Sequence, residues 1–197
     1  FRGGIRFAVR ELRFAVYPQH RGKLTFPAFV FEVRVNRNRS QSIFDQFMNT
    51  GTLKRLRSKS VSINIKAKPA SIKPADWLPA SKLRLIEEWS EDVQQLKTGE
   101  PVTRTITILA EGPLAANLPE LKLADSPGLK QYPDKAVLEN NVTESGIASI
   151  KQIKIALIPT RSGSFKLPAI SIPWWNTATG KQELTVLPEK IIRAHGE

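Results

Sequence analysis

The sequence predicts an all-β protein. Its 197 residues include 14 Pro and 11 Gly, spread between short runs rich in Thr, Ile and Val, which is typical of strands joined by frequent turns. Apolar and polar side chains alternate along residues 60–68 and 102–110, as they do in strands with one buried face. No apolar run is long enough to cross a membrane.

One pattern occurs twice, 141 residues apart. Each copy, 14–31 and 155–172, reads as an apolar strand, a Pro, a Gly and a second strand, so we expect a hairpin in each. The inward register slips by one residue at Pro-Ala, which predicts a β-bulge. A repeat this long indicates two copies of a whole domain. The identical positions are Ala15, Pro18, Gly22, Pro27 and Ala28, which match Ala156, Pro159, Gly163, Pro168 and Ala169.

These elements predict immunoglobulin-like β-sandwich domains in tandem, the first one truncated. Residues 1–70 form the C-terminal part of the first domain, with strands at 5–16, 22–35 and 60–68. Residues 71–81 are a Pro-rich linker that Trp77 pins to a neighbour. Residues 82–197 are a second, complete domain. Its expected strands are 82–89, 102–110, 148–159 and 182–187.

A first domain with only its last strands exposes an apolar inner face. We expect that face to be covered by the second domain or by a second copy of the chain, which makes a homodimer through the first domain possible. An open edge is also suited to receive a strand from a neighbouring protein. The face consists of Phe7, Val9, Phe14, Val16, Leu24 and Phe26.

The positive charge is concentrated in the first 70 residues, which carry 15 Lys and Arg against three acidic residues, while 71–197 hold 15 of each sign. Two interpretations stay open for the basic loop 34–59: a solvated strand face with a basic loop, or a site for a polyanion or an anionic membrane surface. Its apolar patch, which allows one or two helical turns, either plugs the sheet or docks a partner. The candidate interaction residues are Arg34, Arg37, Arg39, Phe44, Phe47, Lys54, Arg55 and Arg57.

The sequence favours no catalytic, metal or cofactor site. There is no Cys, and the two histidines, His20 and His195, lie far apart in the sequence. The acidic cluster 87–92 is either a cation site or a set of paired carboxylates, or, as we favour, a solvated surface, because adjacent carboxylates on a strand face opposite sides. It consists of Glu87, Glu88, Glu91 and Asp92. Trp174 and Trp175 are either a sugar-stacking platform or, because successive strand residues face opposite sides, one core residue and one residue covering a loop. We expect neither an enzyme nor a nucleic-acid-binding protein.

Several stretches in order resemble the BatD family of "oxygen tolerance" proteins. They run through nearly the whole chain and include FAVYPQHRGKLTFPAF, DWLPASKLRLIEEWS, GEPVTRTITILAEG and ALIPTRSGSFKLPAISIPWWNTATGK. The resemblance implies a bacterial envelope protein in the periplasm, with tandem immunoglobulin-like domains and an inner-membrane anchor. It implies partners that are von Willebrand factor A-domain membrane proteins of the same operon, alongside a MoxR-type ATPase.

The function that this resemblance implies is a non-enzymatic scaffold linked to aerotolerance or envelope stress. Membrane attachment is expected only through a C-terminal helix that this sequence lacks, and the chain is expected to be the soluble middle of a longer protein. No catalytic, metal or cofactor residue is carried over from the family.

Overall fold

The structure, a computed structural model, describes residues 9–35 and 52–196. The chain divides into two compact units, Phe1–Pro69 and Ala70–Glu197. In the described ranges, the regular structure is strand apart from two short 3₁₀ turns, η1 (Pro74–Asp76) and η2 (Ala115–Asn117). The all-β prediction is therefore confirmed, while the immunoglobulin-type assignment of the two units stays a prediction.

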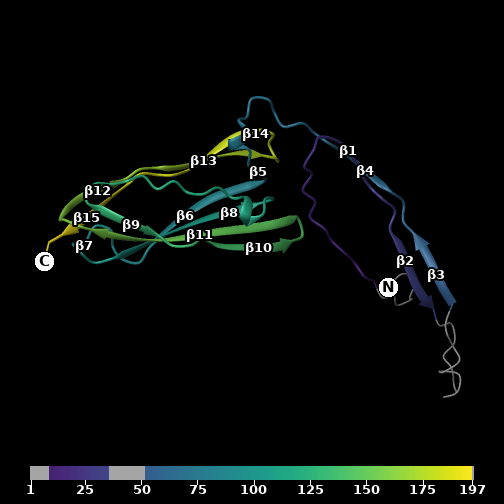
Figure 1. The fold of residues 1–197 in the computed structure, drawn as a ribbon, viewed down its shortest axis with the longest axis horizontal. Helices are drawn as coiled ribbons and strands as arrows, with labels where there is room; N and C mark the ends of the chain where they lie inside the picture. Colours follow the sequence, from purple (N-terminus) through teal and green to yellow (C-terminus); the bar gives the residue numbers. More distant parts are fainter. Residues whose placement is uncertain (1–8, 36–51, 197) are drawn as a thin grey trace, which may run out of the picture. The chain divides into compact units, whose positions relative to one another are not determined.

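One layer of the second unit is a five-stranded antiparallel sheet (Figure 1). Its central strand β11 (Gly146–Pro159) pairs with β8 (Val102–Glu111) on one edge, and β8 pairs with β6 (Lys82–Trp89). On the other edge, β10 (Val137–Thr143) and β9 (Leu129–Pro133) pair with successive parts of β11. Alternate residues of β11, such as Ile153, Ile155 and Leu157, are buried, as a strand with one inward face requires.

The second layer is a long, interrupted hairpin. Strands β12 (Gly163–Leu167) and β13 (Ile170–Asn176) run out, and β14 (Lys181–Leu187) and β15 (Lys190–His195) return. β13 pairs with β14, and β12 with β15. Two short parallel strands complete the layer: β5 (Pro79–Ala80) beside β13 and β7 (Leu96–Lys97) beside β15.

The core of the second unit lies between these layers. Ile106, Ile155 and Leu157 of the large sheet meet Phe165 and Ile192 of the hairpin in one apolar cluster. A second cluster joins Leu83 and Ile108 to Ile172 and Trp174, together with Leu78 and Ala80. Burial of large aliphatic and aromatic side chains stabilises the unit by about 1.5–3 kcal/mol each.

The first unit contains the same interrupted hairpin on a smaller scale. β1 (Gly22–Phe26) pairs with β4 (Val61–Ile65), and β2 (Val30–Val35) pairs with β3 (Thr52–Arg57). β1 matches β12 at the 141-residue offset, residue for residue. Gly22 and Gly163, which open these strands, both have positive φ, at 109° and 129°, a conformation that glycine adopts without a Cβ clash.

The pairing of the repeated strands differs from the hairpins expected at 14–31 and 155–172. β11 and β12 lie in different sheets, because β11 is already paired on both edges and β12 pairs with β15. In the first unit, residues 9–16 form no regular strand. The hairpin prediction was therefore wrong, and the element that both units share is the one formed by β1–β4 and by β12–β15.

The predicted bulge is also replaced by a different feature. The inward face does change parity, from Phe165 and Leu167 to Ile172 and Trp174. However, the two strands skip equal numbers of residues at the break, 168–169 against 188–189, so neither strand has the extra residue of a bulge. Each strand has a Pro there, Pro168 and Pro188, which cannot donate to a ladder. Both strands consequently turn at the same point.

The segment 71–81, expected to be a linker, is partly built into the second unit. Leu78 and Ala80 are buried, and β5 lies in a sheet. The backbone N–H of Trp175 donates to Leu78 O at 2.9 Å, and that of Thr177 donates to Ala80 O at 2.9 Å. These hydrogen bonds satisfy backbone groups that a free linker leaves to water.

The apolar face expected to be covered is exposed in the chain by itself at three of its positions. Val9, Phe14 and Val16 are 87%, 72% and 47% exposed, and Leu24 and Phe26 are half-buried. Phe7 lies outside the described residues. Coverage of this face by the second unit or by a second copy stays a prediction.

Candidate interaction surfaces

The β2–β3 ribbon has one basic face and one apolar face. Because side chains alternate along each strand, Arg34, Arg55 and Arg57 share one face, on which Glu32 forms an exposed ion pair of 3.2 Å with Arg55. Lys54 lies on the opposite face, beside Val33 and near Phe31 and Leu56. The structure thus brings three of the predicted basic residues together and separates the fourth from them.

The other predicted residues of this loop lie outside the described residues. These are Arg37, Arg39, Phe44 and Phe47, and the one or two helical turns expected around them also fall in the range 36–51. The segment that connects the two strands is 12 residues longer in the first unit, 36–51, than in the second, 177–180.

The two adjacent tryptophans have different environments. Trp174 is 4% exposed in the core, and its Nε1 donates to Thr185 Oγ1 at 2.9 Å. Trp175 faces the other way and lies against Trp77, with ring centroids 6.2 Å apart. Because the two rings face opposite sides of β13, they do not make one flat stacking platform.

A buried charge cluster lies between the layers of the second unit. Arg104 Nε donates to Glu87 Oε1 at 2.8 Å, and these side chains are 3% and 7% exposed. Lys190 Nζ, at the rim, is 2.7 Å from Glu87 Oε2. Both cations also lie near the face of Trp89, at 5.6 and 5.7 Å from the ring centroid. The cluster joins β6, β8 and β15.

This cluster corrects the interpretation of residues 87–92 as a solvated surface. Glu87 faces inward with Leu83 and Leu85, whereas Glu88 faces outward. The structure shows no group of three or more His, Cys, Asp or Glu side chains placed to hold a metal ion within 9–35 and 52–196. The carboxylate of Glu87 therefore pairs with cations of the protein itself.

The pKa of Glu87 lies below its usual value of 4.5. Burial is the largest single influence and raises the pKa, but hydrogen bonding by the Lys190 and Trp89 side chains and the charges of Arg104 and Lys190 together outweigh it. The ionised form is thus the native form at neutral pH.

We expect this pair to make the second unit sensitive to acid. Because the folded pKa is depressed, Glu87 contributes stability above its unfolded pKa of 4.5 and loses that contribution as the pH falls through the lower folded value. Urea unfolding followed by Trp fluorescence between pH 7 and pH 3 measures this loss. A Glu87→Gln variant is expected to show a flatter pH dependence below pH 4.5; an unchanged slope contradicts the assignment.

A second buried cation was missed from the sequence. Lys151 of β11 is 3% exposed, and its Nζ contacts Glu120 Oε1 at 2.6 Å and Leu118 O at 3.2 Å. Its position on the inward face follows from the parity of Ile153 and Ile155. This contact ties the segment after η2 to the sheet.

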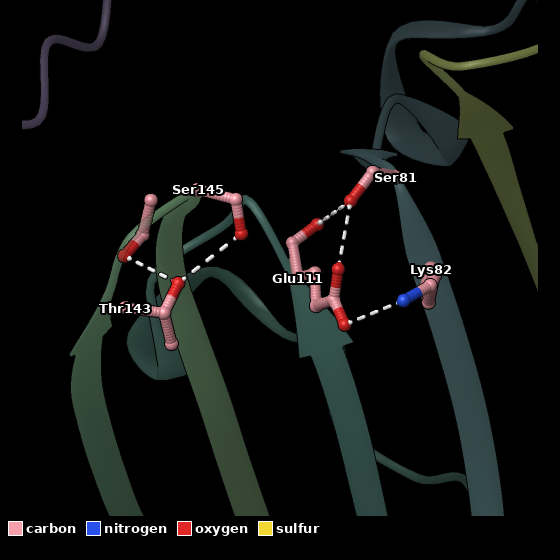
Figure 2. Close-up of polar contacts among 6 residues, drawn as sticks. Ser81, Lys82, Glu111, Thr143 and Ser145 are labelled. Atoms are coloured by element: carbon pink, nitrogen blue, oxygen red, sulfur yellow. Dashed lines mark hydrogen bonds and ion pairs between the residues drawn. The ribbon is translucent and has the colours of Figure 1, made fainter.

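One end of the large sheet carries a polar cap (Figure 2). Glu111, at the end of β8, accepts from Lys82 Nζ at 3.0 Å, and its backbone O accepts from the Ser81 N–H at 2.8 Å. At the β10–β11 turn, Thr143 Oγ1 donates to Gly146 O at 3.1 Å. These are short-range contacts between neighbouring strands and turns, so they explain how the sheet ends without implying a ligand.

The comparisons with known proteins point to one family. A family model described as the "BatD DUF11 like domain" matches residues 89–188, more than half of the chain. The chain belongs to the BatD family. A search of curated proteins and a search of solved structures gave no match.

The BatD match falls wholly inside the second unit. It begins at Trp89, the last residue of β6, and ends at Pro188, just before β15. BatD proteins are associated with the bacterial envelope. Among the described residues, no helix is long and apolar enough to cross a membrane.

Proposed function

We propose that this BatD chain is a non-enzymatic interaction module of the bacterial envelope. It binds a von Willebrand factor A-domain membrane protein of the same operon through the basic face of its first hairpin. In this proposal the module works in the periplasm, in a protein anchored to the inner membrane, and its role is linked to aerotolerance or envelope stress.

The comparison of the two hairpins carries this proposal. They share strand order, register and the interruption of both strands. At the positions of Arg34, Arg55 and Arg57, the second hairpin has Trp175, Leu184 and Val186. Since the second hairpin forms the same paired strands without arginine at these positions, the fold does not require these charges. A role in recognition explains them better than stability does.

The basic face is suited to a partner with an acidic surface. Arg55 and Arg57 lie two residues apart on β3, and Arg34 lies on β2 diagonally across from Arg55. Glu32, opposite Arg55, is the acidic residue of this face. Arginine forms bidentate hydrogen bonds with carboxylates and is enriched at protein interfaces.

Neutralising the three arginines tests the proposal. We expect the variant Arg34→Gln, Arg55→Gln, Arg57→Gln to bind the purified A-domain protein at least about tenfold more weakly, because complementary charges across an interface are lost. The matched control is Lys130→Gln, Lys154→Gln, Lys181→Gln, which removes three exposed charges from the second unit. Equal weakening by both variants contradicts a specific role of the first hairpin.

The same variants separate a second candidate function. Three arginines on one face also suit an anionic membrane surface, where each basic residue contributes about 1 kcal/mol. The test is co-sedimentation with phosphatidylglycerol vesicles. Salt-sensitive vesicle binding that is lost in the arginine variant, without binding to the A-domain protein, supports the membrane candidate and overturns the first.

A further inference from the structure

The buried charge cluster of the second unit contains a hydrogen-bond donor that has no acceptor. Glu87 Oε1 is in contact with Arg104 Nε, and Glu87 Oε2 is in contact with Lys190 Nζ. Arg104 Nη2 is buried and has no hydrogen-bond partner in the part of the chain that the structure describes. Buried donors of this kind are rare in native proteins, where nearly all find an acceptor. Arg104 Nη2 therefore has room for an acceptor from outside the cluster.

A small cavity adjoins Arg104. It has a volume of about 20 Å³, enough for one oxygen atom. Lys122 and Gln131 line it, together with residues 167–170, where β12 and β13 are interrupted. Pro168 and Ala169 of this stretch are exposed, so the interruption of the strand forms the mouth of the cavity.

The charge around this cavity favours an anion. Arg104, Lys122 and Lys190 bring three positive charges to the cluster and the cavity, and Glu87 is the one carboxylate paired with them. Among anions, a carboxylate fits best. It is planar, pairs with the N–H groups of a guanidinium, and enters a narrow cavity with a single oxygen.

We propose that this cavity is a subsite for a carboxylate group of a binding partner, supplied by an acidic side chain or by a chain terminus. The carboxylate oxygen accepts a hydrogen bond from the guanidinium of Arg104, and Lys122 adds charge at the rim. The site lies in the second unit, so it does not rest on the function proposed for the first hairpin.

The test uses the 197-residue chain with ¹⁵N labelling and acetate as the probe. The Arg104 Nε–Hε resonance is followed by NMR while sodium acetate replaces sodium chloride at constant ionic strength. A saturable shift is expected. Lys122→Gln is expected to weaken acetate binding by about two- to fivefold, as for one exposed charge, and the control Lys130→Gln is expected to leave it unchanged.

Filling the cavity gives the decisive result. Ala169→Leu is expected to abolish the acetate-induced shift while the rest of the spectrum stays native; Ala169→Val serves if the larger side chain disturbs the fold. No saturable shift in the parent chain, or the same shift in the filled variant, overturns the proposal and leaves water as the occupant. Competition by two short peptides then distinguishes the two carboxylate sources. One peptide has an acidic side chain and an amidated C-terminus; the other has a free C-terminal carboxylate and no acidic side chain.

Discussion

Replacing Glu87 by alanine is expected to destabilise the second unit by about 3–5 kcal/mol, the usual cost of removing one partner of a buried ion pair. Arg104 is 3% exposed, and its Nε loses its acceptor in this variant, as the Lys190 ammonium loses its carboxylate. Urea unfolding followed by Trp fluorescence measures the effect, because all four tryptophans, at 77, 89, 174 and 175, lie in the second unit.

The control for this prediction removes both charges. Glu87→Leu combined with Arg104→Met is expected to recover most of the loss, since well-packed apolar residues often replace a buried ion pair without a net cost. A loss below about 1 kcal/mol in Glu87→Ala would show that the pair is far better solvated than its exposure of 7% and 3% indicates.

The second large effect contrasts equivalent positions of the two hairpins. Ile172 and Phe31 match at the 141-residue offset, yet Ile172 is 3% exposed and Phe31 is 56% exposed. Ile172→Ala is expected to cost about 2–5 kcal/mol, as for other large-to-small changes in a packed core. Phe31→Ala is expected to cost less than about 1 kcal/mol in the chain alone.

Hydrogen exchange by mass spectrometry measures both variants, because the tryptophans do not report on the first unit. A large loss of protection around β1–β4 in Phe31→Ala would show that the inner face of this hairpin is covered in solution. Light scattering on the same samples then distinguishes a second copy from a covering segment of the same chain. If the two variants lose equal protection while light scattering shows a monomer, the exposure described for Phe31 is contradicted.

Strand positions were predicted best in the second unit, because the alternation of side chains is a local property. In the first unit, residues 9–16 of the expected strand 5–16 form no strand, and β3 (Thr52–Arg57) lies in the expected loop 34–59. The expected strand 82–89 coincides with β6, and 102–110 is one residue shorter than β8. Pairing could not be predicted as well. Three residues separate β11 from β12, as in a hairpin, but nothing in the repeated pattern shows that both edges of β11 are taken by β8, β9 and β10.

The buried charges had a signal in the sequence. The parity that places Ile106 and Ile108 inward also places Arg104 inward, and Glu87 has the parity of Leu83 and Leu85. A cation at an inward position requires a nearby carboxylate. The basic face was harder to predict, since whether Arg34 and Arg55 share a face depends on the β2–β3 register, which the side-chain pattern of either strand does not determine.

The most direct test of the proposed interaction surface compares two equivalent positions in living cells. A photo-crosslinking amino acid is placed at Arg55 on the first hairpin or at Leu184, its counterpart on the second. We expect a crosslink to the von Willebrand factor A-domain membrane protein from position 55 and none from position 184. Crosslinks of equal yield from both positions, or none from position 55 while the A-domain protein is present, would contradict the assignment of the partner surface to the first hairpin.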